Sequence, residues 1–102
     1  MAELVRICGR KDLPEVGWAK EFAAAGKIIC VANVDGKICA VDNECPHHGG
    51  PLGQGAVEEG KIVCPWHSWS FDPVSGRASH FPQAKVEVYE ITTNGDDVLV
   101  KV

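Results

Sequence analysis

The sequence predicts an all-β fold, a small antiparallel sandwich or barrel. Short apolar, β-branched runs recur along its 102 residues, with turn signals between them. No segment sustains the apolar repeat of a long helix. Asp35-Gly36 separates two of these runs and is a strong signal for a two-residue hairpin turn. The length fits a single domain over residues 1–102.

Strand and turn signals alternate through the N-terminal part of the chain. The predicted elements are a strand at 4–8, a Pro-containing connection at 11–15, a strand at 17–24 and hairpin strands at 28–34 and 37–43. The alanine-rich end of the third of these elements also fits a helical turn. In the hairpin register, Ala32 faces Cys39 and Cys30 faces Val41.

The same alternation continues toward the C-terminus. The predicted elements are a turn at 58–60 between short strands at 56–57 and 62–63, a turn at 72–76, a strand at 86–92, a turn at 94–96 and a strand at 98–102. Such strand spacing without long helices favours a sandwich or barrel.

Composition restricts the possible partners and setting. The net charge of −4 argues against nucleic acid as a ligand. No apolar run approaches the roughly 20 residues that a membrane-spanning helix needs. The N-terminus lacks the apolar core of a signal peptide, so we expect a reducing, cytoplasmic setting.

The five cysteines agree with that setting. If Cys45 and Cys64 bind a metal, the remaining three form an odd set, which is a poor disulfide framework. Cys30 and Cys39 lie diagonally across the predicted hairpin, roughly 7–8 Å apart, which is too far for a disulfide. We therefore expect Cys8, Cys30 and Cys39 to be buried free thiols.

Cys45, His47, Cys64 and His67 are the candidate metal ligands. They form C-x-H and C-x-x-H motifs separated by sixteen residues. The surrounding segments 45–57 and 64–71 contain no Asp, Glu, Lys or Arg and are rich in Gly, Pro and Trp. Uncharged loops of this kind suit the enclosure of a cofactor and contact with a partner.

Three interpretations of these residues are open. In the first, each cysteine is a buried core thiol and each histidine is a polar residue with its hydrogen bonds satisfied. This explains any one of the four residues well, but it explains two matched Cys–His pairs poorly. Two cysteines and two histidines also suit tetrahedral zinc, although zinc fingers usually keep like ligands together. A mixed pair on each loop favours a two-iron centre, because one loop can then reach both metals.

The segments CPHHGGPL at 45–52 and CPWHSWSFD at 64–72 resemble the two cluster-binding boxes of Rieske [2Fe–2S] proteins. Among these, the chain most resembles the small soluble bacterial ferredoxins associated with oxygenases. The resemblance implies a Rieske-type antiparallel β-sandwich or barrel with a two-loop cluster-binding subdomain. The first loop is then about 43–57 and the second loop about 63–76.

By this resemblance the chain holds one [2Fe–2S] cluster, with Cys45 and Cys64 on one iron and His47 and His67 on the other. Two thiolates leave the oxidised cluster neutral, whereas four would leave it with two negative charges. A neutral centre accepts an electron more readily, so its potential lies above that of the all-cysteine type.

Departures from respiratory Rieske proteins lower the expected potential. Those proteins join their loops by a disulfide, but Gly50 and Trp66 occupy the matching positions here. Trp69 and Phe71 stand where the same proteins have a Ser and a Tyr whose hydroxyls donate to sulfur. Fewer donors lower the potential, so we expect a value closer to about −150 mV than to +300 mV.

Other residues around the boxes have expected supporting roles. His48 is expected to be an exposed neighbour of the ligands, and His80 to lie in a segment that shields the cluster. Trp66 and Trp69 are either walls of the cluster or core aromatics. Four glycines are expected to give the first loop its backbone freedom: Gly49, Gly50, Gly53 and Gly55.

The resemblance implies an electron-transfer protein rather than an enzyme. The sequence has no G-x-G-x-x-G nucleotide motif and no length for a mononuclear-iron catalytic domain. The expected role is a monomeric carrier of single electrons from a flavin-dependent reductase to a terminal oxygenase. The alternative is a small Rieske subunit of a nitrite reductase-like enzyme.

Overall fold

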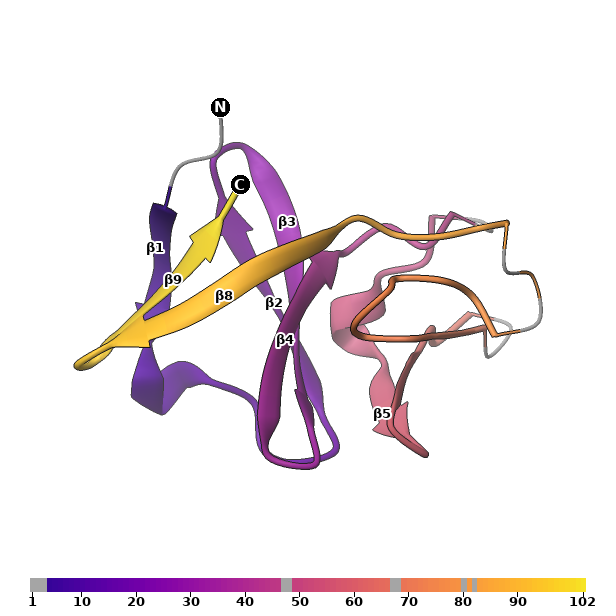
Figure 1. Ribbon diagram of the computed structural model, residues 1–102, viewed down its shortest axis with the longest axis horizontal. Coiled ribbons are helices and arrows are strands. Elements are labelled where there is room, and N and C mark those ends of the chain that lie inside the picture. The colour runs from indigo at the N-terminus through magenta and orange to yellow at the C-terminus, as the bar shows by residue number, and fades with distance from the viewer. Residues whose placement is uncertain (1–3, 47–48, 67–68, 80, 82) are drawn as a thin grey trace.

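The β3–β4 hairpin is the central element of the computed structural model, which describes residues 4–46, 49–66, 69–79, 81 and 83–102 (Figure 1). Strand β3 (Lys27–Val34) pairs with β4 (Lys37–Asp42), with Ala32 opposite Cys39. The turn residues Asp35 and Gly36 have φ values of 54° and 94°. Positive φ at both positions is the geometry of a type I′ turn, so the predicted hairpin and its register are confirmed.

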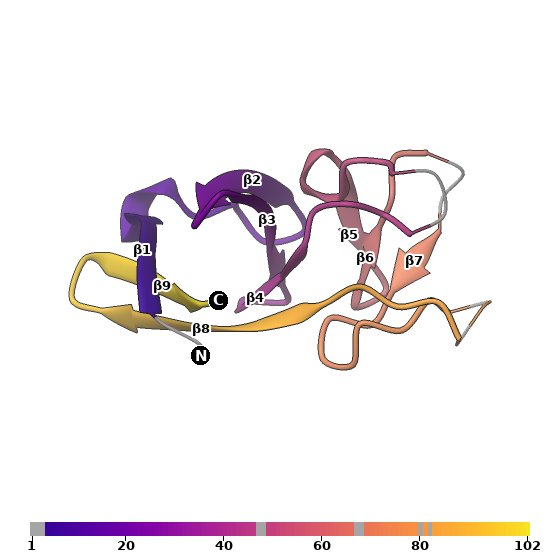
Figure 2. The ribbon, with the colours of Figure 1, turned by 90° about the horizontal axis from the view of Figure 1, so that it is seen from above.

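The hairpin belongs to a strongly curved antiparallel sheet. Its other strands are β1 (Leu4–Gly9), β2 (Ala19–Ala24), β8 (Val88–Asn94) and β9 (Asp97–Lys101). Within the described residues the strand order is β1-β9-β8-β4-β3-β2. Figure 2 shows the sheet curling round so that β1 approaches β2, which nearly closes a barrel. The predicted antiparallel all-β fold is thus confirmed.

A smaller sheet lies at the other end of the molecule from β1 and β9 (Figure 2). It consists of β5 (Ala56–Glu58), β6 (Lys61–Val63) and β7 (Ser70–Phe71), in that order. The predicted turn at 58–60 connects the first two of these strands. The described helices are two short 3₁₀ turns, η1 (Arg10–Asp12) and η2 (Leu52–Gln54). Neither these nor any other helix in the described ranges has the length and apolarity to cross a membrane.

The structure decides one open alternative and moves one strand boundary. The strand predicted at 17–24 is confirmed as β2, and its alanine-rich end is extended rather than helical because it pairs with β3. The strand predicted from residue 86 begins only at Val88, as β8. The Val86 N–H donates instead to the Gly76 carbonyl oxygen (2.9 Å), so this residue secures the 72–76 turn.

The hairpin is buried on both faces, which explains its nearly continuous apolar sequence. One face packs into the barrel, where the buried residues are Ala24, Ile29, Val31, Ala40, Tyr89 and Val100. The other face packs against the smaller sheet and its loops in a second core made of Cys30, Ala32, Val41, Cys45, Leu52, Ile62, Cys64, Phe71, Ala78 and Val86. The hairpin therefore forms the wall on which the loop region is built.

The cysteines outside the candidate metal centre are buried free thiols, as predicted. No disulfide links any cysteine within the described part of the chain. Burial raises the pKa of Cys30 to about 12 and raises the pKa values of Cys8 and Cys39 above their ordinary range. These thiols are therefore poor nucleophiles and pack as small apolar side chains.

Candidate metal centre

The fold brings the two predicted cysteine ligands together. Cys45 lies just beyond β4 and Cys64 just beyond β6, and each is only 1% exposed. Both belong to the core between the hairpin and the smaller sheet. Beyond burial, the neighbouring Cys45 thiol contributes to raising the pKa of Cys64, so the two thiols lie close together. Two adjacent sulfurs in an apolar pocket are the arrangement that two thiolate ligands of one metal ion require.

The backbone of the first loop turns back beside Cys45. The Cys45 N–H donates to the Gly50 carbonyl oxygen (2.9 Å), and the Gly49 N–H donates to the Cys45 carbonyl oxygen (2.7 Å). Gly49 has a φ of 74°, which a side chain would disfavour. Glu44 and Pro51 then form an isolated β-bridge. These contacts fix the direction from which the loop approaches Cys64.

The second loop supplies a hydrogen bond to sulfur. The Cys64 N–H donates to the Trp69 carbonyl oxygen (2.7 Å), and the Trp66 N–H donates to Cys64 Sγ (3.4 Å). Burial raises the pKa of the Cys64 thiol, whereas the Trp66 N–H acts in the opposite direction. A bound metal ion would hold this sulfur as thiolate, with its charge stabilised by that N–H.

Gly50 lets the first loop approach Cys64 and Trp66 more closely than a side chain would allow. A Cβ added at Gly50 would lie 2.7 Å from Cys64 Sγ and 3.2 Å from the Trp66 ring. Gly50 and Trp66, which match the disulfide positions of respiratory Rieske proteins, thus face each other, and the Trp66 ring packs on Gly50. Two buried sulfurs on closely packed loops, with a backbone donor to one of them, fit an iron–sulfur cluster.

The aromatic residues of the second loop have different environments. Trp69 stacks on Phe81, with ring centroids 4.7 Å apart and an interplanar angle of 13°. It also makes a tilted contact with Phe71, at 6.4 Å, and Phe71 is fully buried. Trp66 is 49% exposed. Trp69 is therefore partly a core residue, whereas Trp66 lies between Gly50 and solvent.

The histidines lie outside the described residues. They are the predicted ligands His47 and His67, the predicted neighbour His48 and the predicted shielding residue His80. Their assignments therefore stay predictions.

The glycines of the first loop are needed chiefly for space. Positive φ occurs at Gly49 but not at Gly50, Gly53 or Gly55, so the expected backbone freedom applies to one of the four. A Cβ at Gly53 would collide with the Glu21 side chain, and one at Gly55 with the Val63 carbonyl oxygen. These two glycines are required because the loop approaches both sheets closely. No local sequence pattern reveals this approach.

Sequence reasoning missed a buried polar residue next to the site. Asn43 is only 8% exposed and links β2 to η2 through its side chain. Its partner Glu21 is far away along the chain. No local sequence signal connects the two residues.

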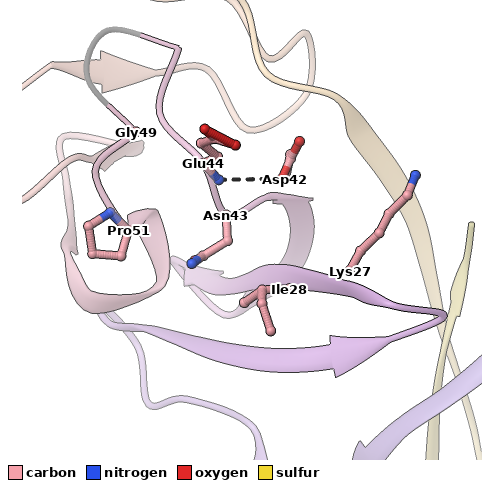
Figure 3. Close-up of a pocket in the computed structure, with 7 residues that line it drawn as sticks. All are labelled: Lys27, Ile28, Asp42, Asn43, Glu44, Gly49 and Pro51. Atoms are coloured by element: carbon pink, nitrogen blue, oxygen red, sulfur yellow. Dashed lines mark hydrogen bonds between the residues drawn. The ribbon is translucent and has the colours of Figure 1, made fainter.

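An open pocket beside the first loop is distinct from the metal centre (Figure 3). Its volume is about 410 Å³, and it is lined by Lys27, Ile28, Asp42, Asn43, Glu44, Gly49 and Pro51. The Asp42 and Glu44 side chains lie on one side of it, and the Glu44 N–H donates to Asp42 Oδ1 (3.3 Å). Neither Cys45 nor Cys64 lines the pocket, so we assign it no part in metal binding.

Comparison with known families identifies the class of protein. The Rieske [2Fe-2S] domain family matches residues 3–90. The chain belongs to this family, and its cofactor is accordingly a [2Fe–2S] cluster. This agrees with the paired buried sulfurs and with the interpretation of the two boxes.

The curated relatives include both short and long proteins. The chain is 33% identical over 90 residues to the ferredoxin component of the naphthalene 1,2-dioxygenase system of Pseudomonas aeruginosa, covering 87% of this chain and 86% of that one. It is 32% identical over 101 residues to apoptosis-inducing factor 3 of Mus musculus, covering 84% of this chain. The match spans only 15% of that longer relative.

Solved structures share the whole fold. A ferredoxin of Sphingomonas yanoikuyae B1 is 28% identical, with a TM-score of 0.85 over 98% of this chain and 99% of that one. A putative NADH-dependent nitrite reductase small subunit from Mycobacterium tuberculosis has a TM-score of 0.89, covering 100% of this chain and 96% of that one. At 20% identity, the second likeness concerns the fold alone.

Proposed function

We propose that this chain is a one-electron carrier that accepts electrons from a flavin-dependent reductase and delivers them to a terminal oxygenase. The observation that carries the proposal is the adjacent, buried pair Cys45 and Cys64 on two uncharged loops of a Rieske domain. The ferredoxin components among its relatives, which belong to dioxygenase systems, support the choice of partners.

The proposed ligands are Cys45 and Cys64 for one iron and His47 and His67 for the other. A bound cluster would supply reversible one-electron chemistry. The protein surrounds the two sulfurs with apolar side chains and thereby excludes water from them. The Trp66 N–H donates to Cys64 Sγ and so stabilises negative charge on that sulfur.

The proposed docking surface is the cluster tip, which we define as the uncharged segments 45–57 and 64–71. Trp66 is 49% exposed there, and Phe81, 45% exposed, lies beside it through its stack on Trp69. Exposed aromatic side chains suit a small interface that forms and dissociates quickly. Neither nucleic acid nor a membrane is among the proposed partners.

The proposed setting follows from the sequence. The chain is proposed to form a single domain over 1–102, with cluster-binding loops at about 43–57 and 63–76. It is proposed to act as a cytoplasmic monomer and as an electron-transfer protein rather than an enzyme.

A second candidate is a small Rieske subunit of a nitrite reductase-like enzyme. The putative nitrite reductase small subunit shares the fold, with a TM-score of 0.89, so the fold is compatible with this alternative as well. The two functions differ in the lifetime of the complex. Recovery of a stable stoichiometric complex with a large reductase subunit would favour the second function, whereas transient reduction by a flavin-dependent reductase would favour the carrier.

The first experiment is anaerobic purification followed by visible spectroscopy and by iron and sulfide analysis. We expect a coloured protein with two iron and two sulfide ions per chain, as a [2Fe–2S] cluster requires. A colourless protein with stoichiometric zinc would contradict the proposal.

Replacement of a predicted histidine ligand tests the ligand assignment. His67→Cys should lower the reduction potential or abolish the cluster, because a thiolate adds negative charge to the centre. His48→Ala is the matched control and should leave the visible spectrum unchanged. An unchanged spectrum and potential in the His67 variant would show that the ligand is another residue.

A further inference from the structure

We propose that Asn43, Glu21 and Gln54 form a polar brace that positions the first loop, and with it Cys45, against the barrel. Asn43 is the central residue of the brace, and it acts as a positioning residue rather than as a ligand. The inference rests on the proposed ligand role of Cys45.

The brace is a short network of hydrogen bonds. Asn43 Nδ2 donates to Glu21 Oε2 (2.6 Å), and Asn43 Oδ1 accepts from the Gly53 N–H (2.6 Å). Gln54 Nε2 donates to Glu21 Oε1 (3.2 Å). Among the described residues, Asn43 is the one buried polar or charged side chain. The bond between Asn43 and Gly53 is buried and is therefore costly to break, because the separated groups lose their partners without regaining water.

Asn43 connects three separate elements. Its side chain contacts β2 through Glu21 and the η2 turn through Gly53. Its backbone N–H donates to the Ile28 carbonyl oxygen of β3 (3.3 Å), and its carbonyl oxygen accepts from the Leu52 N–H (2.8 Å). Figure 3 shows the Asn43 side chain directed away from the side chains of Asp42 and Glu44. A single residue therefore fixes where the first loop leaves the barrel.

The same contacts fix where the loop returns. Cys45 is two residues after Asn43, and its N–H is bonded to the Gly50 carbonyl oxygen (2.9 Å). The η2 turn follows shortly after Gly50 and is held by Asn43. Both ends of the segment that carries Cys45 thus converge on one amide side chain.

The brace requires a glycine at position 53, because a side chain there would collide with it. A Cβ at this position would lie 2.7 Å from Asn43 Oδ1 and would also collide with Glu21. The glycine lets its own N–H approach the Asn43 oxygen to 2.6 Å. Close packing and hydrogen bonding therefore demand the same arrangement.

An isosteric exchange of amide and carboxylate tests the brace. Asn43→Asp keeps the acceptor for Gly53 but turns the donor toward Glu21 into a second carboxylate. We expect the visible absorbance to be lost about fivefold faster in the presence of an iron chelator, because the coupling between two contacting residues has been removed. The reduced protein should also have an altered electron paramagnetic resonance spectrum, since the Cys45 sulfur moves.

Adding Glu21→Gln to Asn43→Asp should rescue the protein. The glutamine amide can then donate to the carboxylate at position 43, while its oxygen still accepts from Gln54. We expect cluster loss and spectrum to return to wild-type behaviour within about twofold, the remainder being the usual context dependence of paired substitutions. A double variant no better than the single variant, or a single variant identical to wild type, would overturn the proposal.

Two further variants complete the design. Asp42→Asn removes a neighbouring charge whose side chain lies outside the brace, and it should behave as wild type. Gln54→Glu places a carboxylate against Glu21 at an exposed position, so it tests the network even if Asn43→Asp fails to fold. Its faster cluster loss should again be reversed by Glu21→Gln, and absence of any effect would count against the brace.

Hydrogen exchange separates this inference from the proposed function. Repulsion from Glu21 should move the new carboxylate at position 43 away from the Gly53 N–H, so this N–H should exchange faster in Asn43→Asp than in wild type and recover in the double variant. That measurement needs no cluster. A colourless wild-type protein would refute the proposed function, whereas unchanged Gly53 exchange would refute the brace.

Discussion

Gly50 and Trp66 show at the residue scale how the two loops meet without a disulfide. The Trp66 ring lies over the glycine, and a Cβ there would be 2.7 Å from Cys64 Sγ. Ring and glycine fill the space by packing, which holds the loops without a covalent bond. The close packing of the two loops in this chain therefore requires the absence of a side chain at position 50.

We expect Gly50→Ala to lose most of its iron, because the added methyl group would collide with Cys64 Sγ and displace this proposed ligand. Iron and sulfide analysis of the purified variant measures this. Gly95→Ala is a matched control: its position is open, and the strain at its φ of 63° costs about 1 kcal/mol without touching the loops. A fully loaded Gly50→Ala protein would contradict this role of Gly50.

Asp72 provides a residue-scale prediction about pH. The N–H groups of Ser75 and Val74 donate to its carboxylate and lower its pKa below the ordinary value of 3.8. Because the folded-state pKa is the lower one, the stabilisation is complete above pH 3.8 and is lost as the pH falls through the folded-state pKa.

We therefore expect Asp72→Asn to be less stable than wild type near pH 6, with a gap that closes in acid. Thermal unfolding followed by circular dichroism, from about pH 6 down to well below the ordinary pKa of 3.8, measures the gap. A gap that is constant, or that widens in acid, would show that the turn does not depend on the ionised carboxylate.

At the scale of elements, an aromatic stack joins the second loop to the segment that follows the 72–76 turn. The Trp69 and Phe81 rings are nearly parallel, and their centroids are 4.7 Å apart. The Ala84 N–H donates to the Phe81 carbonyl oxygen (2.8 Å), and the Ala78 N–H donates to the Ala84 carbonyl oxygen (2.9 Å). The stack therefore fastens a hydrogen-bonded turn onto the loop that carries Cys64.

Phe81→Ala should loosen this segment, since a stacked pair contributes about 0.5–1.5 kcal/mol beyond the area it buries. We expect faster hydrogen exchange at the Ala84 N–H, whereas Val74→Ala, at a position 70% exposed, should leave that exchange unchanged. Equal exchange in Phe81→Ala and wild type would show that the segment is held by its backbone alone.

At the scale of the whole molecule, the surroundings of the cluster set its reduction potential. The core around Cys45 and Cys64 is apolar, and Phe71 is fully buried in it without a hydroxyl. Among the described contacts, the hydrogen-bond donor to a ligand sulfur is the Trp66 N–H, which bonds to Cys64 Sγ. An apolar environment with few donors disfavours added negative charge and so favours a low potential.

We expect a midpoint potential below zero, near about −150 mV, at the lower end of the Rieske range. Phe71→Tyr introduces a hydroxyl where high-potential relatives have one. A new hydrogen bond to sulfur worth about 1.4 kcal/mol would raise the potential by about 60 mV. Voltammetry measures both values, with Tyr89→Phe in the barrel core as control. A wild-type potential above zero would contradict this account.

Local chemistry accounts for the parts of the structure that were predictable. Asp35-Gly36 fixed the hairpin register, because few turns accept positive φ at both central residues. The start of β8 was misplaced, since Val86 bonds to Gly76 instead of joining a ladder. The glycines at 53 and 55 were misjudged for a similar reason: their neighbours come from distant strands.

The sequence by itself determined the all-β class, the central hairpin and the family to which the two boxes belong. These features follow from patterns of residue types at short spacing, because such patterns determine the local backbone conformation and the local ligand set. The tertiary structure alone decided that Cys45 and Cys64 are adjacent and buried, that Gly50 lies under Trp66 and that Asn43 reaches Glu21. Such contacts depend on how two sheets pack around one hairpin, and no local pattern records that packing.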